Sequence, residues 1–174
     1  MNEQIILYLL SKGESAMYGL SKNIQKYFGF ITKPSFGTIQ PALKRLEKQG
    51  CLKSSMFYTD GGKPSCYYSI TNDGKDFLIK KINEKPSYNP VQFIPCVKIK
   101  LICSDAMVAA DKRALYTALK TAVISMSEKT QRMINDKAND NFIYKILLDN
   151  TVLEYKTLIS LIEGLEDACC GQLG

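Results

Sequence analysis

The sequence predicts a mostly α-helical protein with one small β-hairpin, divided into two domains near residue 86. Three observations carry this prediction. Apolar residues recur at helical spacing in short segments of the first half and in two long segments of the second. Two strand-like runs flank a Gly-Gly turn at Gly61–Pro64. A break containing several prolines follows Lys85. We expect residues 1–85 to form one domain and residues 86–174 a second, helical one.

The first two helices are predicted at residues 3–12 and 18–28. Gly13 ends the first helix, and Gly29 suits the position after the second. Their apolar faces consist of Ile5, Ile6, Leu9 and Leu10 in the first helix, and Leu20, Ile24, Tyr27 and Phe28 in the second.

A third helix follows Ser35, whose hydroxyl can cap it by accepting a hydrogen bond from a free backbone N–H. Pro41 cannot donate to the carbonyl four residues earlier, so the helix either begins near Gly37 or bends. One face is apolar and the other is polar and cationic. The apolar face holds Ile39, Leu43 and Leu46 with Ala42 beside them, and the opposite face holds Gly37, Gln40, Pro41, Lys44 and Lys48, flanked by Arg45.

A β-hairpin and a fourth helix complete the first half. Alternating residues from Leu52 to Tyr58 predict one strand, and residues 65–70 predict the strand that returns from the turn. Tyr67 and Tyr68 are expected to be one core and one surface residue. Thr71 can cap the fourth helix, which carries Phe77, Leu78 and Ile82.

At the start of the second half, prolines including Pro95 are expected to interrupt any helix. A β-like run then spans Val97 to Cys103, and two long helices are predicted after it. Both long helices have broad apolar surfaces, and a partner chain is the simplest cover for them. The stripes are Leu115, Leu119, Ala122, Met126 and Met133 on one helix; Leu148, Val152, Tyr155, Ile159 and Ile162 on the next; and a second stripe there of Leu158, Leu161 and Leu165.

Positive charge is concentrated in the first half. Residues 1–85 contain 13 Lys and Arg against 7 Asp and Glu, whereas residues 86–174 contain 10 of each, so the formal charge of +6 arises entirely before the break. A polyanion such as DNA would exploit this asymmetry.

Several function classes lack the residues they need. The chain has no histidine and no Cys-x-x-Cys pair among its 6 cysteines, which disfavours a zinc site. It also has no Walker loop and no nucleophile motif, so we predict neither an enzyme nor a bound cofactor. A thiol sensor at exposed Cys169 and Cys170 is a minor alternative. No apolar run would span a membrane and the N-terminus does not read as a signal peptide, so we expect a cytoplasmic protein.

Three helices followed by a hairpin make a winged helix-turn-helix, a module that presses one helix and one hairpin against DNA. Lys44, Arg45 and Lys63 are the candidates for phosphate contacts, since cations hold the backbone. Ser35, Thr38 and Gln40 are the candidates for reading bases from the end of the helix that enters the major groove. Taken without this context, the cations would be read as an ordinary solvated helix face.

The first half also resembles the PadR family of bacterial transcriptional regulators. The matching pieces, in order, are Met17–Leu20, Pro34–Ile39, Ala42–Gly50, Gly61–Pro64 and Tyr67–Gly74. The resemblance implies an N-terminal winged helix, a C-terminal helical dimerisation domain, and a homodimeric repressor of palindromic promoter DNA with half-sites about 34 Å apart. A further hypothesis, compatible with this one, is a small-molecule sensor whose effector lies between the C-terminal helices.

This sequence departs from the family pattern at three places. Gln40 replaces a usual Tyr, Tyr18 replaces a usual His, and Ser65 and Cys66 stand where basic residues are common. The last difference should weaken attraction between the wing and phosphates. A protein-interaction module that uses the winged-helix surface without specific DNA binding is the alternative function.

Overall fold

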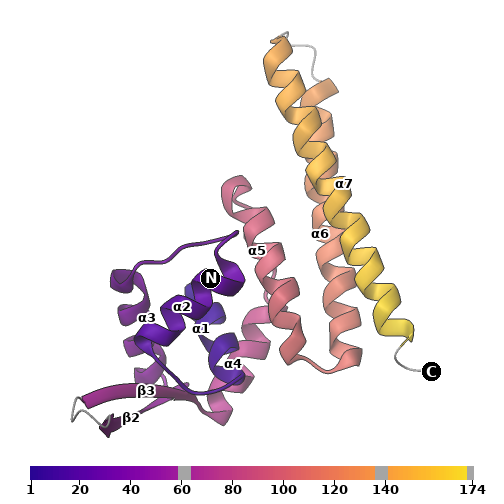
Figure 1. Cartoon of the computed structure of the whole chain (residues 1–174). Coiled ribbons are helices and arrows are strands. Elements are labelled where there is room, and N and C mark those ends of the chain that lie inside the picture. The colour runs from indigo at the N-terminus through magenta and orange to yellow at the C-terminus, as the bar shows by residue number, and fades with distance from the viewer. Residues whose placement is uncertain (59–63, 136–140, 172–174) are drawn as a thin grey trace. The chain divides into compact units, whose positions relative to one another are not determined.

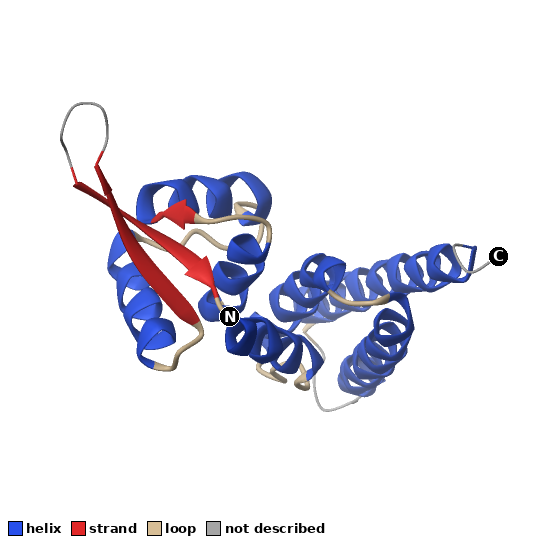
Figure 2. Ribbon diagram, turned by 90° about the horizontal axis from the view of Figure 1, so that it is seen from below, coloured by secondary structure: helices blue, strands red, loops and turns tan. Residues whose placement is uncertain are grey.

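The computed structural model describes residues 1–58, 64–135 and 141–171. The chain forms two compact units, residues 1–107 and 108–174, which are considered separately. It is mostly helical with one small antiparallel sheet, as predicted (Figures 1 and 2). Among the described residues, no helix is both long enough and apolar enough to cross a membrane.

The first unit contains the predicted four helices and hairpin, together with a fifth helix. Its elements are α1 (Asn2–Ser11), β1 (Ser15–Ala16), α2 (Met17–Phe28), α3 (Phe36–Lys48), β2 (Leu52–Tyr58), β3 (Pro64–Ile70), α4 (Asn72–Asn83), α5 (Pro90–Cys103) and the short 3₁₀ helix η1 (Ser104–Ala106).

Helix α1 lies at the centre of this unit and contacts α2, α3, α4, α5 and β3. Ile5, Ile6 and Leu7 are fully buried there, because helices pack against α1 on several sides. The sheet has the strand order β1-β3-β2 (Figure 2). The pairing of β2 with β3 runs from Leu52 opposite Ile70 to Tyr58 opposite Pro64.

The prediction of a β-like run at Val97–Cys103 is wrong, because these residues belong to α5. Asn89 caps this helix by accepting a hydrogen bond from the Val91 N–H at 3.0 Å, and Pro90 occupies the first position, where no N–H is needed. Pro95 lies inside the helix and does not interrupt it. The carbonyl that Pro95 leaves without a donor belongs to Val91, which is 84% exposed, so water can reach it.

Helix α5 is grouped with the first unit and packs against α1. The segment between α4 and α5 contains the boundary that we placed near residue 86. The division of the chain into a winged-helix domain that ends near residue 86 and a second domain therefore stays a prediction.

The second unit is a pair of long helices, α6 (Ala109–Asn135) and α7 (Phe142–Gly171), which lie side by side (Figure 1). Glu166 of α7 accepts hydrogen bonds from Lys120 Nζ at 2.5 Å and Thr117 Oγ1 at 2.8 Å. These two donors hold the pKa of the Glu166 carboxyl below its usual value. The predicted stripes need two corrections, since Leu158 is buried and Met133 is exposed. Cys169, which we expected to be exposed, is half-buried. The side chain of Cys170 lies outside the described part.

Candidate nucleic-acid interface

Helix α3 has one buried face and one exposed face, as the periodicity predicts. Its fully buried residues are Ile39, Ala42, Leu43 and Leu46, which hold the helix against α1 and α2. The exposed face presents Gln40, Pro41, Lys44, Arg45 and Lys48. The helix begins at Phe36 and runs through Pro41. The lost hydrogen bond at Pro41 would have gone to the carbonyl of Gly37, which is solvent-exposed.

The N-terminal end of α3 is polar and open to solvent. Ser35 occupies the cap position, as predicted, but its hydroxyl makes no hydrogen bond to the helix backbone. It lies 3.2 Å from the hydroxyl of Thr38 instead. The backbone N–H groups of Thr38 and Ile39 donate to the Ser35 carbonyl at 2.9 and 3.0 Å, so the side chain of Ser35 caps none of the first N–H groups of α3.

The cationic end of α3 contains Lys44 and Arg45, both exposed. Arg45 Nε donates to Glu3 Oε1 of α1 at 2.9 Å. An exposed ion pair of this kind contributes little stability, about 0–1 kcal/mol, but it fixes the position of the guanidinium. A phosphate that binds Arg45 would have to share or replace this carboxylate.

Two polar contacts fix α3 relative to the strands and to α4. Ser54 of β2 donates to the carboxylate of Glu47. Thr71 donates to the carbonyl of Gly50 at 2.6 Å and accepts from the Gly74 N–H at 3.0 Å, which confirms its predicted role as the cap of α4. The turn after α3 is therefore tied to the start of α4.

The described part of the hairpin has an apolar surface on β2. Met56, Phe57 and Tyr58 of β2 are exposed, and the Phe57 ring packs edge-on against Tyr67 at a centroid distance of 5.4 Å. Tyr67 and Tyr68 are both half-buried, so the expected division into one core and one surface residue is wrong.

The Tyr68 phenol remains neutral at ordinary pH. Burial, a hydrogen bond with Cys66 and the nearby charge of Glu47 raise its pKa to about 12. Tyr68 therefore adds no charge to the hairpin face that it shares with Ser54 and Cys66.

The six predicted contact residues divide into two groups. Five of them, Ser35, Thr38, Gln40, Lys44 and Arg45, lie on the exposed side of α3 or at its start. Lys63 and most of the predicted Gly-Gly turn lie outside the described residues. Sequence reasoning missed Glu3, which holds Arg45, because no pattern predicts an ion pair between residues 42 positions apart. It also left out Tyr18, which is 73% exposed at the start of α2, although the Met17–Leu20 segment marked that turn.

Comparison with known proteins agrees with this fold. Residues 6–80 match the family model described as the transcriptional regulator PadR-like family. No match is found among curated proteins. A transcriptional regulator from Clostridium thermocellum is 35% identical, with 45% of this chain and 76% of that chain covered and a TM-score of 0.42.

Two further solved structures are similar to the chain. A PadR family transcription regulator from Clostridium difficile R20291 is 31% identical, with 46% of this chain and 81% of that chain covered and a TM-score of 0.41. Bacillus subtilis PadR in complex with operator DNA is 18% identical, with 96% of this chain and 98% of that chain covered and a TM-score of 0.48. From the family-model match and the identity to the Clostridium difficile protein, the chain belongs to the PadR-like family of transcriptional regulators.

Proposed function

We propose that this regulator is a non-enzymatic cytoplasmic repressor that binds palindromic promoter DNA as a homodimer. The observation that carries the proposal is the exposed face of α3, which presents Gln40, Lys44 and Arg45 to solvent while its other face is buried. Cations on this face suit phosphates, and the polar groups at the start of the helix suit base edges.

The DNA contact can be tested with the double substitution Lys44→Ala and Arg45→Ala. Duplex fragments selected from a random pool would first be collected with the wild-type protein. Binding of the best fragment would then be measured by fluorescence anisotropy at several salt concentrations. Removing two phosphate contacts from each protomer should weaken binding and flatten the slope of log affinity against log salt by about 1.8 per protomer, or about 3.6 for a dimer on its palindrome.

The matched control removes two exposed lysines from the second unit, Lys129→Ala with Lys156→Ala. It makes the same change in net charge away from α3, so its affinity and salt slope should remain close to those of the wild type. Equal affinities of the two double variants would overturn the proposed contact through α3.

The homodimer is supported by a second apolar face of α7. Buried residues such as Val152, Tyr155 and Ile162 pack within the unit. A separate stripe is exposed, and at 100° per residue its members fall within one third of the helix circumference. This exposed stripe consists of Phe142, Ile146, Asn150, Leu153, Thr157, Leu161, Gly164 and Ala168. Large apolar side chains aligned in this way on a surface are typical of an interface.

The dimer can be tested with Ile146→Glu combined with Leu153→Glu. Both residues are exposed, so the substitutions should leave the fold of one chain intact while placing charges in the interface. Light scattering after size exclusion should show a mass near 19.5 kDa for the variant and twice that for the wild type. Glu163→Lys, which changes an exposed residue outside the stripe, should remain dimeric. A monomeric wild type would contradict the proposal.

Repression is tested by transcription in vitro from the promoter whose DNA the protein retains. Added wild-type protein should lower the transcript yield, and the Lys44→Ala, Arg45→Ala variant should not. A rise in transcript would indicate an activator.

The alternative is a protein-interaction module. The exposed Met56, Phe57 and Tyr58 favour it, since apolar side chains on a strand surface suit a protein partner. A flat response of binding to salt, without the slope that counterion release produces, would support this alternative over the DNA-binding proposal.

A further inference from the structure

A groove of about 610 Å³ lies in the first unit, and none of its lining residues belongs to α3 or to the hairpin. The lining residues come from α1 and its C-cap, from α2 and the turn that follows it, and from α5. They are Tyr8, Leu9, Lys12, Asn23, Tyr27, Phe30 and Ile102. All of them except Lys12 and Asn23 are aromatic or aliphatic, so the walls of the groove are mainly apolar.

The aromatic walls of the groove are open to solvent. Tyr27 is 49% exposed and Phe30 is 73% exposed. A small-molecule pocket normally buries most of the surface of its ligand, whereas walls that stay this exposed suit a longer partner that lies across them. Apolar side chains that gather on a surface in this way are typical of a protein interface, where aromatic residues are enriched.

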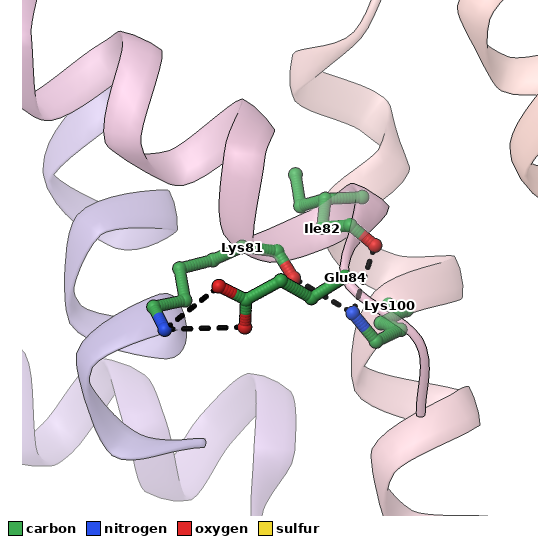
Figure 3. Close-up of polar contacts among 4 residues, drawn as sticks. All are labelled: Lys81, Ile82, Glu84 and Lys100. Carbon is green, nitrogen blue, oxygen red and sulfur yellow. Dashed lines mark hydrogen bonds and ion pairs between the residues drawn. The ribbon is translucent and has the colours of Figure 1, made fainter. Parts of the chain in front are cut away.

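The α5 wall of the groove is anchored by a buried lysine. Lys100 is 2% exposed, and its Nζ donates to the carbonyls of Lys81 at 2.7 Å and Ile82 at 2.8 Å, near the end of α4 (Figure 3). Ile102, two residues further along α5, lines the groove. Because α5 is fastened to α4 in this way, a partner would meet a wall that is already formed and would lose less entropy on binding.

Two ammonium groups lie against the aromatic walls. Lys12 Nζ is 5.4 Å from the centre of the Tyr8 ring, and Lys26 Nζ is 4.9 Å from the centre of the Tyr27 ring. A cation is attracted to the face of an aromatic ring, so these contacts keep positive charge at the groove. Lys12 also donates to Asp105 of η1 at 2.5 Å, and this carboxylate offsets the charge of Lys12.

Helix α2 adds a row of positive charge beside the groove. At 100° per residue, Lys22 and Lys26 form a row next to the one that contains Asn23 and Tyr27. Both lysines are exposed. Residues 15–46 contain five Lys and Arg and no Asp or Glu, so no acid on α2 offsets this row. The groove therefore combines apolar walls with a cationic edge.

We propose that this groove, which we call the α1–α2–α5 groove, binds an acidic amphipathic segment of another protein. The apolar side chains of that segment would pack on Tyr27 and Phe30, and its carboxylates would lie near Lys22 and Lys26. An amphipathic helix with apolar residues at i, i+3, i+4 and i+7 is a common occupant of an apolar groove. Complementary charge selects an acidic partner over a basic one and speeds the encounter. The proposal does not depend on DNA binding through α3.

A nucleic-acid strand would also meet the lysines, but the groove offers its bases little to bind. Bases are held by stacking on aromatic rings and by polar groups at their edges. Leu9 and Ile102 supply neither, and Asn23 is the one amide in the lining. We therefore assign the groove to a protein segment, and treat a nucleic-acid strand or a second copy of this chain as outcomes that would contradict the assignment.

The chemistry of the partner can be tested by selection from a random peptide library displayed on phage, with the full-length protein as bait. The recovered peptides should be enriched in Asp and Glu and should carry large apolar residues at helical spacing. Enrichment of basic peptides, or no enrichment, would overturn the proposal. The peptide with the highest affinity would then be synthesised with a fluorescent label and its binding measured by anisotropy.

The apolar walls are tested with Tyr27→Ser combined with Phe30→Ser. Both side chains are exposed, so the fold should be retained, and the affinity for the selected peptide should fall about tenfold or more. Tyr18→Ser with Phe36→Ser is the matched control, because it makes the same change at exposed residues outside the lining. Equal affinities of the two double variants would show that the peptide binds elsewhere and would overturn the proposal.

The cationic edge is tested with Lys22→Gln combined with Lys26→Gln. We expect affinity for the selected peptide to fall about fivefold and to depend less on salt, because the attraction between exposed charges is screened by ions. Lys129→Gln with Lys156→Gln, which makes the same change in the second unit, should bind like the wild type. If Tyr27→Ser with Phe30→Ser does not fold, this pair decides, and an undiminished affinity would overturn the proposal.

The other two occupants are tested in the same assays. An unlabelled single-stranded oligodeoxynucleotide should not displace the labelled peptide, and Tyr27→Ser with Phe30→Ser should leave the mass in light scattering unchanged. Displacement would reassign the groove to nucleic acid, and a lower mass would reassign it to a second copy, so either result would overturn the proposal. Failure of the wild type to retain promoter DNA would instead contradict the proposed function and leave the groove standing.

Discussion

Among the described residues, the buried side-chain nitrogen of Gln4 has no acceptor stronger than the thiol of Cys103, and this has a measurable cost. Gln4→Leu keeps the volume of the side chain and removes this donor. The free energy of unfolding should therefore rise by about 1–3 kcal/mol, as measured by urea denaturation. A loss of stability in this variant would show that the amide is satisfied in the free protein.

Lys100 should make stability depend on pH in a defined direction. Burial lowers its pKa in the folded state, so between that lowered pKa and 10.5 the unfolded chain binds more protons than the folded one. Stability therefore rises with pH across this window. The free energy of unfolding would be measured from pH 7 to 10.5 for the wild type and for Lys100→Met. Subtracting the two curves leaves the contribution of Lys100, because the other titrating groups are common to both proteins. If the stability of the wild type relative to Lys100→Met fell as the pH rose, the lowered pKa of Lys100 would be contradicted.

Single residues were the hardest features to predict from sequence. The cap position of Ser35 could be predicted from its place before an apolar stripe. The partner of its hydroxyl could not be predicted, because the Thr38 hydroxyl competes with the backbone N–H groups for it. Tyr27 fits the apolar spacing of α2 and is nevertheless 49% exposed. Periodicity gives the direction of a side chain and says nothing about whether a neighbouring element covers it.

At the scale of elements, the start of α4 depends on a close backbone approach. A Cβ added at Gly74 would lie 2.1 Å from the carbonyl oxygen of Cys51 and 2.8 Å from Ile70 Cγ1. Gly74→Ala must therefore move α4 away from the strands, and we expect a loss of about 1–3 kcal/mol in thermal or chemical unfolding.

Gly37→Ala is the matched control within α3. A Cβ there would meet nothing closer than the Ser35 hydroxyl at 3.6 Å, and alanine favours a helix, so stability should stay constant or rise by about 1 kcal/mol. Equal losses in the two variants would indicate a general intolerance of glycine replacement.

Element types were predictable where long patterns had clear ends. Helices α1 and α2 and the hairpin strands lie within about two residues of their predicted bounds, because caps and turns marked them. Helix α5 was missed for a physical reason. Its sequence, from Pro90 to Cys103, is apolar on several faces and contains two prolines, so neither the helical period nor the usual breaker rule distinguishes it from a strand.

At the scale of the whole molecule, the sequence predicted a helical second half with surplus apolar surface, but not which residues form it. The predicted second stripe on α7 included Leu158, which is buried, and omitted Phe142, Ile146 and Leu153, which are exposed. A helical wheel cannot tell which of two apolar faces packs inside its own chain, because both satisfy the same spacing.

The exposed stripe of α7 is tapered, and the taper implies a direction for a second copy. Three of its four bulky side chains, Phe142, Ile146 and Leu153, stand toward one end. The smaller Thr157, Gly164 and Ala168 lie toward the other end, where Leu161 is the one bulky member. If two copies of α7 run antiparallel about a twofold axis level with residue 155, three of the four bulky side chains of the stripe each face a small one: 142 opposite 168, 146 opposite 164, and 153 opposite 157. The fourth, Leu161, lies opposite position 149. Parallel copies would instead splay apart at the bulky end. Spin labels at position 168, in a background without other cysteines, should then lie about 39 Å apart, from 26 residues at 1.5 Å each. A separation near 10 Å would mean that the copies point the same way.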